Sequence, residues 1–167
     1  MPDLRDQLLR CFQGRVCLMG LGNVDYGDDG FGVRLAERLQ RGIGSKSGNV
    51  RIMMAGDAPE RFLGRCADES HDHLMFLDAV EFGGEPGAVV FLNSNEVAEC
   101  FPQISTHKIS LNLLAKCIEA NGKTQAWLLG VQPQSLARSQ HLTPRVEQTF
   151  ELLIKLLGNL LSQSNVC

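Results

Sequence analysis

The chain has 167 residues, of which 44% are hydrophobic and 21% are charged, and its formal net charge is −3. This composition is typical of one globular domain and excludes disordered, collagen-like and coiled-coil proteins. Sixteen basic residues against nineteen acidic ones leave no positive excess for nucleic acid, and no apolar run approaches the ~20 residues of a membrane span. We therefore expect a single domain, residues 1–167, that binds neither nucleic acid nor a membrane.

Two further features bear on the cellular compartment. The N-terminal segment, MPDLRDQLLRCF, is amphipathic and lacks the apolar core and cleavage site of a secretory signal. Six cysteines are scattered without a CxxC pair and most lie in apolar runs, which is typical of reduced, buried thiols. Both features predict a cytoplasmic protein.

Helical and extended segments alternate along the first half of the chain. The apolar spacing predicts a leading helix over residues 3–12, a buried strand at 16–19, a loop with five glycines from Gly20 to Gly32, and a helix from Val33. A Ser/Gly-rich loop then leads to a second strand at 50–54. A helix starts near Pro59 with Asp57 as its cap, and a third strand at 73–77 ends at Asp78.

The second half of the chain predicts the sheet topology. The connection before the fourth strand, residues 88–92, is too short for a parallel crossover, so this strand should run antiparallel at an edge. Ser105 or Thr106 can cap the next helix, residues 126–129 form a fifth strand, and Thr143-Pro144 opens a long helix. The pattern predicts a three-layer α/β sandwich: a mostly parallel five-stranded sheet with one antiparallel strand and helices on both faces.

The carboxyl ends of the strands are where an open α/β sheet binds its ligands. Asp28-Asp29 follow the first strand, Asp78 ends the third, and His107 begins the helix after the return segment, so we expect them to meet. Two carboxylates and an imidazole suit zinc, nickel or manganese, or general acid–base catalysis on an amide. Structural roles remain open: helix cap for Asp28 or Asp29, turn residue for Asp78, and solvated first-turn residue for His107. We interpret the other histidines as surface or structural residues: His71, His73 and His141.

The glycine loop partly matches a dinucleotide-binding fingerprint. Gly20-Leu21-Gly22 follows a buried strand, but Asp25 stands at the third glycine position, and Asp28-Asp29 would repel phosphate. The chain also lacks the P-loop, HExxH and GxSxG patterns. The acidic loop therefore favours a cation or an uncharged substrate, and a nucleotide-binding regulator is a weaker alternative.

Four segments carry ordered motifs that extend over roughly 130 residues: Gly20-Leu21-Gly22-Asn23 with Gly27-Asp28-Asp29-Gly30-Phe31-Gly32; HLMFLDAV at 73–80; Ser105-Thr106-His107-Lys108 with Leu111-Asn112; and Leu129-Gly130-Val131-Gln132-Pro133 with Leu142-Thr143-Pro144 and Val146-Glu147. Together they resemble the motifs of the [NiFe]-hydrogenase maturation endopeptidases. Residues 57–60 and the pair Thr106-His107 look most like the formate-hydrogenlyase branch of that family.

The resemblance implies an aspartic-type or nickel-dependent endopeptidase that removes a C-terminal extension from the nickel-loaded large-subunit precursor of a [NiFe]-hydrogenase. It implies that the nickel belongs to the substrate and that the enzyme holds no cofactor tightly. Catalysis and recognition of the metal would fall to three residues: Asp29, Asp78 and His107. We expect a monomer whose substrate cleft includes Asn23, Gly56 and Asp57.

One position departs from the family pattern. The family usually carries an acidic residue at the end of the second strand, where this chain has Met54-Ala55-Gly56. Asp57, three residues later, is one possible replacement; changed substrate choice or weaker activity is another consequence. Met54 is also the best support for an alternative function, a non-catalytic metal- or precursor-binding module of the same fold.

Overall fold

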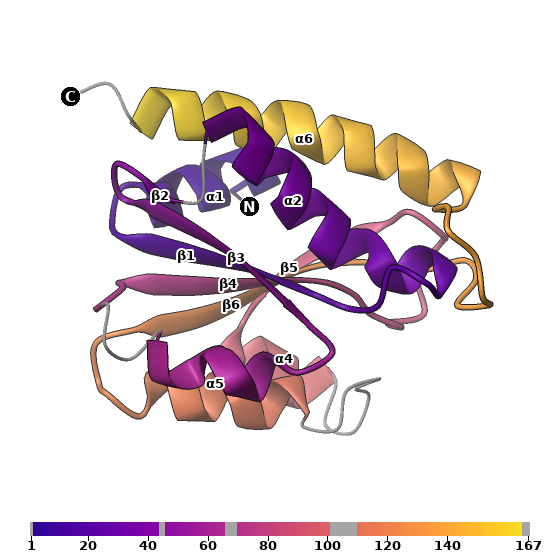
Figure 1. Ribbon diagram of the computed structural model, residues 1–167. Helices are drawn as coiled ribbons and strands as arrows, with labels where there is room; N and C mark the ends of the chain where they lie inside the picture. Colours follow the sequence, from indigo (N-terminus) through magenta and orange to yellow (C-terminus); the bar gives the residue numbers. More distant parts are fainter. Residues whose placement is uncertain (1, 44–45, 66–69, 101–109, 165–167) are drawn as a thin grey trace.

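A six-stranded sheet lies between two layers of helices in this computed structural model, which describes residues 2–43, 46–65, 70–100 and 110–164 (Figure 1). The strands are β1 (Val16–Leu21), β2 (Lys46–Ser47), β3 (Val50–Gly56), β4 (His73–Ala79), β5 (Val89–Asn93) and β6 (Gln125–Val131). The helices are α1 (Leu4–Phe12), α2 (Phe31–Ile43), α4 (Ser94–Cys100), α5 (Leu111–Glu119) and α6 (Pro144–Ser164), with 3₁₀ turns η1 (Gly27–Gly30) and η2 (Pro59–Phe62). None of these described helices is long and apolar enough to cross a membrane.

The strand order is β2-β3-β1-β4-β6-β5. β3, β1, β4 and β6 are parallel, and β5 pairs antiparallel with β6 at one edge. The predicted sandwich and its antiparallel edge strand are thus confirmed. The two-residue β2 adds an antiparallel pairing at the opposite edge, where the sequence favoured a loop. Gly48, at φ +55°, lets the chain reverse there in a tight turn.

Two apolar layers hold the sheet and its helices together. β1 is buried along its whole length, as expected of a central parallel strand covered on both faces. One apolar cluster joins the sheet to α1, α2 and α6, and the other joins its opposite face to α4 and α5. Figure 1 shows the same layers, with α2 and α6 on one side of the sheet and α5 on the other. The predicted apolar stripe of α6 is buried at each position: Val146, Phe150, Leu153, Leu157 and Leu160.

Two predicted helix caps are wrong. η2 begins at Pro59 after Ala58 and has no side-chain cap, because the Asp57 carboxylate lies beside another loop. α5 begins at Leu111, and the cap is Ser110, whose hydroxyl oxygen accepts from the Leu113 N–H at 3.1 Å. The two residues expected to cap this helix, Ser105 and Thr106, lie outside the described residues.

α4 was not among the predicted helices, although the sequence contains a signal for it. Asn93 and Glu96 form a reciprocal capping box: the Glu96 N–H donates to Asn93 Oδ1 at 2.9 Å and the Asn93 N–H donates to Glu96 Oε1 at 3.3 Å. The return segment after β5 therefore starts with a helix.

Candidate functional site

The point where the chain changes direction in the sheet lies between β1 and β4. The connection from β1 to β3 passes through α2 on one face of the sheet, whereas Phe62 and Leu63, between β3 and β4, pack against the apolar cluster of the other face. Two neighbouring strands whose connections leave on opposite faces create a crevice at their carboxyl ends, where open α/β sheets bind ligands. Asp29 follows β1 in η1, and Asp78 lies near the end of β4.

Close packing brings the two aspartates to the same edge of the sheet. Gly20 is the register partner of Leu77, so Asp78 lies level with the last residue of β1. Gly32, three residues after Asp29, lies so close to β4 that a Cβ built on it would be 1.9 Å from the Leu77 carbonyl oxygen. The turn that carries Asp29 is therefore packed directly against the end of the strand that carries Asp78.

The two carboxylate oxygens of Asp29 differ in their contacts with the described residues. Its Oδ2 accepts from the Asn23 N–H at 2.9 Å, whereas the buried Oδ1 has no hydrogen-bond partner among the described residues. Gly22 makes this geometry possible: its φ is +114°, and a Cβ there would be 1.8 Å from the Asp29 carbonyl oxygen. An oriented carboxylate with a spare oxygen can accept a proton or bind a cation.

Asp78 is only 1% exposed, and its Oδ1 accepts from the Ala79 N–H at 2.9 Å. Strand alternation directs its side chain to the same face as Leu74 and Phe76, which is the face that α5 covers. His107 precedes α5 but lies outside the described residues, so its meeting with the two aspartates stays a prediction. Within the described ranges, no three His, Cys, Asp or Glu side chains are grouped to hold a metal ion.

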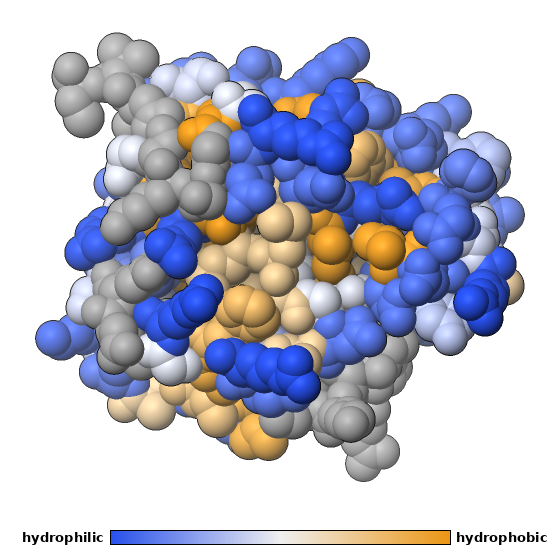
Figure 2. All heavy atoms as spheres, viewed as in Figure 1, coloured by the Kyte–Doolittle hydropathy of each residue, from blue (hydrophilic) through white to orange (hydrophobic). Residues whose placement is uncertain are grey.

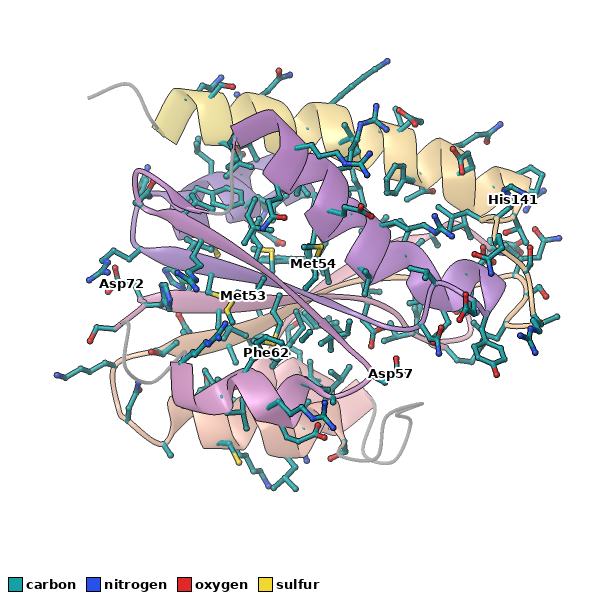
Figure 3. The ribbon with its side chains drawn as sticks, in the orientation of Figure 1. Met53, Met54, Asp57, Phe62, Asp72 and His141 are labelled. Atoms are coloured by element: carbon teal, nitrogen blue, oxygen red, sulfur yellow. The ribbon has the colours of Figure 1, made fainter. Side chains whose placement is uncertain are left out.

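The residues expected to line the cleft lie together at the rim of this edge. The Gly22 N–H donates to the Gly56 carbonyl at 2.9 Å, and Asn23 Nδ2 donates to Asp57 Oδ2 at 3.4 Å. Asn23 thus links the carboxylates of Asp29 and Asp57. Figure 3 shows Asp57 just beyond the end of β3, and its carboxylate is exposed, as a group that contacts substrate must be.

Asp28 has a structural role that the sequence could not distinguish from that of its neighbour. It is fully buried, and its Oδ2 accepts from the N–H groups of Gln134 and Ser135 and from Thr143 Oγ1, at 2.9, 3.1 and 2.8 Å. Its Oδ1 accepts from the Thr143 N–H at 2.8 Å. Asp28 therefore fixes the loop before α6 to η1 and supports the turn that carries Asp29.

The three described histidines lie away from the two aspartates. His71 and His73 are at the start of β4, the opposite end from Asp78. Burial lowers the pKa of His73, although Asp72 opposes the shift, and its Nδ1 accepts from Trp127 Nε1 at 3.0 Å. His141 is exposed in the loop before α6 (Figure 3). Their interpretation as surface or structural residues agrees with these positions.

The sequence matches the family model for hydrogenase maturation proteases over residues 33–159. The chain belongs to the hydrogenase maturation protease family. It is 33% identical over 157 residues to the hydrogenase 2 maturation protease of Escherichia coli, covering 91% of this chain and 93% of that one. It is 27% identical to the hydrogenase 3 maturation protease of the same species over 140 residues, covering 84% and 86%.

The structure of the protease agrees with this membership. The [NiFe] hydrogenase maturation protease HycI of Thermococcus kodakarensis matches with a TM-score of 0.82 and 31% identity, over 93% of this chain and 99% of that one. The proteins similar to this chain thus include members of the formate-hydrogenlyase branch and also the hydrogenase 2 maturation protease. These comparisons support a peptidase and give no support to a non-catalytic module of the same fold.

Proposed function

We propose that this protease is a cytoplasmic enzyme that removes a C-terminal extension from the nickel-loaded large-subunit precursor of a [NiFe]-hydrogenase. The observation that carries the proposal is the Asp29 carboxylate, oriented by Asn23 and with Oδ1 left without a partner among the described residues. Its position at the same carboxyl edge of the sheet as Asp78 is where the fold favours a ligand. The relatives named as hydrogenase maturation proteases support the choice of substrate.

In this proposal, Asp29, Asp78 and His107 approach the nickel that the precursor presents. Carboxylate and imidazole groups are suitable ligands for nickel, and three open ligands bind a free ion weakly compared with one already held by another protein. The metal thereby fixes the scissile bond near the carboxylates, and such orientation can contribute ~7 kcal/mol to catalysis. The enzyme needs no tightly bound metal of its own in this scheme.

Asp29 is the better candidate for the base that takes a proton from the attacking water. It is less buried than Asp78, and its Oδ1 has no described partner to displace. The described free thiols do not suggest an acyl-enzyme route. Cys17 is buried, and burial raises the pKa of Cys11 to about 11. Cys117 is exposed, but it lines a pocket with His71 at the opposite end of the sheet from Asp78. Direct attack by water, with nickel polarising the carbonyl, agrees best with these groups.

The test is cleavage of the nickel-loaded precursor by Asp29→Asn and Asp78→Asn variants, followed by mass spectrometry of the released peptide. We expect each variant to lose at least about a hundredfold in kcat/KM, since each substitution removes a charge from the reacting edge. Asp25→Asn is the matched control, because Asp25 is exposed on the same loop and accepts from Gln140 Nε2. Full activity of a folded Asp29→Asn protein would refute the proposed role of Asp29.

A further inference from the structure

β3 has an open edge over most of its length. On the side away from β1, β2 pairs with Val50 and Arg51, and no other described strand follows it in the sheet. The segment from Ile52 to Gly56 therefore has no strand partner on that side among the described residues. Figure 1 shows β3 crossing the near face of the molecule from β2 to the edge that carries the site.

The direction of the backbone groups follows from the pairing with β1. The Val16 N–H donates to the Asn49 carbonyl at 2.9 Å, which sets Arg51 and Met53 to face β1 in the regular part of the strand, before the register shifts after Met54. Alternation along a strand then directs the N–H and C=O groups of Ile52 and Met54 to the open side. Two such residues can receive a ladder of hydrogen bonds from an added strand.

The open edge is apolar and carries no charged residue or proline to oppose strand addition, and the register shift between β3 and β1 falls after Met54. Natural sheets protect edges with lysine, proline or charge, and residues 52–56 contain none of these. Met54, on the middle part of β3 in Figure 3, is 37% exposed, so an apolar side chain is accessible at this edge. Figure 2 shows an apolar band over β3 with hydrophilic residues around it.

The edge is continuous with the candidate site. β3 ends at Gly56, whose carbonyl is bonded to Gly22, and the next residue, Asp57, contacts Asn23. A segment lying along β3 leaves the edge beside Asp57, two strand spacings or about 10 Å from β1, and passes the end of β3 to reach Asp29. An endopeptidase must hold its substrate backbone in an extended conformation. Pairing with this edge would hold a segment in that conformation close to the aspartates.

We propose that the open edge of β3 at Ile52–Gly56 binds the extended segment around the cleavage site of the precursor as an added strand, with Met54 as its apolar contact. The proposal rests on the proposed function, because it takes the precursor as the occupant. Main-chain hydrogen bonds to Ile52 and Met54 supply affinity that depends little on sequence. The aspartates and the nickel then select the bond that is cut.

Amide hydrogen exchange tests the docking without any need for cleavage. The probe is a synthetic metal-free peptide that spans the cleavage junction of the precursor, added to the ¹⁵N-labelled protease. We expect the amides of Ile52 and Met54 to exchange at least about tenfold more slowly at saturation, whereas the amide of Met53, which faces β1, changes little. Unchanged exchange at Ile52 and Met54, with or without binding elsewhere, would overturn the proposal.

Substitution of Met54 tests the same edge in the cleavage reaction. Lysine at this position adds a charge of the kind that blocks edges, so Met54→Lys should raise KM for the precursor about tenfold with kcat within about twofold. Leu152→Lys adds the same charge at an exposed apolar position of α6, away from this edge, and is the matched control, with KM unchanged. A normal KM for Met54→Lys overturns the proposed docking and leaves the proposed cleavage intact. Protection of the Ile52 and Met54 amides, together with no cleavage of the precursor by the wild-type protein, refutes the proposed function alone.

Discussion

The buried carboxylate of Asp28 should make a large contribution to stability, and Asp28→Asn tests it. The substitution keeps the shape of the side chain but removes the charge that four donors share. Hydrogen bonds to a charged group contribute ~1.5–3 kcal/mol each, and breaking a buried charged network costs ~3–5 kcal/mol in all. Asparagine retains one acceptor oxygen, so we expect a loss of about 3 kcal/mol in the free energy of unfolding.

Urea unfolding at 25 °C measures this loss directly, and the thermal midpoint of a chain of this size should fall by about 6–12 °C. Asp25→Asn is again the control, because an exposed substitution on the same loop should change stability by less than about 0.5 kcal/mol. If Asp28→Asn unfolds within 0.5 kcal/mol of the wild type, the argument that this carboxylate fixes the loop before α6 to η1 is wrong.

Two further predictions concern packing and pH. Gly32→Ala should lower the free energy of unfolding by ~3 kcal/mol or more, because the new methyl would clash with the Leu77 carbonyl oxygen. Gly42→Ala, in the same helix with nothing within 4 Å, is the control and should raise the free energy of unfolding by ~0.5–1 kcal/mol. Equal thermal unfolding midpoints for the two variants would contradict this. Burial lowers the pKa of His73 in the folded protein, so the unfolded chain takes up this proton at a higher pH than the folded chain does. The free energy of unfolding should therefore fall as the pH drops below about 6.5. His73→Gln should weaken that dependence, measured as unfolding free energy at pH 7.5 and 5; an identical dependence would count against the role of burial.

The parts of the fold that the sequence predicts are those with local signals. The continuous apolar run at 16–19 became the fully buried β1, and the long apolar stripe after Pro144 became α6. The antiparallel direction of β5 followed from the length of one connection. The capping box of Asn93 and Glu96 shows that α4 could also have been found, since its signal lies within four residues.

The site depends on contacts that no local pattern contains. Asp28 and Asp29 are adjacent and chemically identical. Asp28 is buried against residues more than a hundred positions later, whereas Asp29 Oδ1 has no hydrogen-bond partner in the part of the chain that the structure describes. Asp57 fails to cap η2 because of another contact between residues distant in the sequence: its carboxylate accepts from Asn23 Nδ2 across the edge of the sheet. The open edge of β3 likewise follows from how few residues of β2 pair with it.

We propose that the protease recognises nickel held by its substrate through three residues: Asp29, Asp78 and His107. The most direct measurement compares nickel-loaded and metal-free precursor, incubated with the purified protease, by intact-mass spectrometry. We predict that the C-terminal peptide is released from the nickel-loaded precursor alone and that His107→Ala abolishes its release. Equal release from both forms of the precursor would contradict the account.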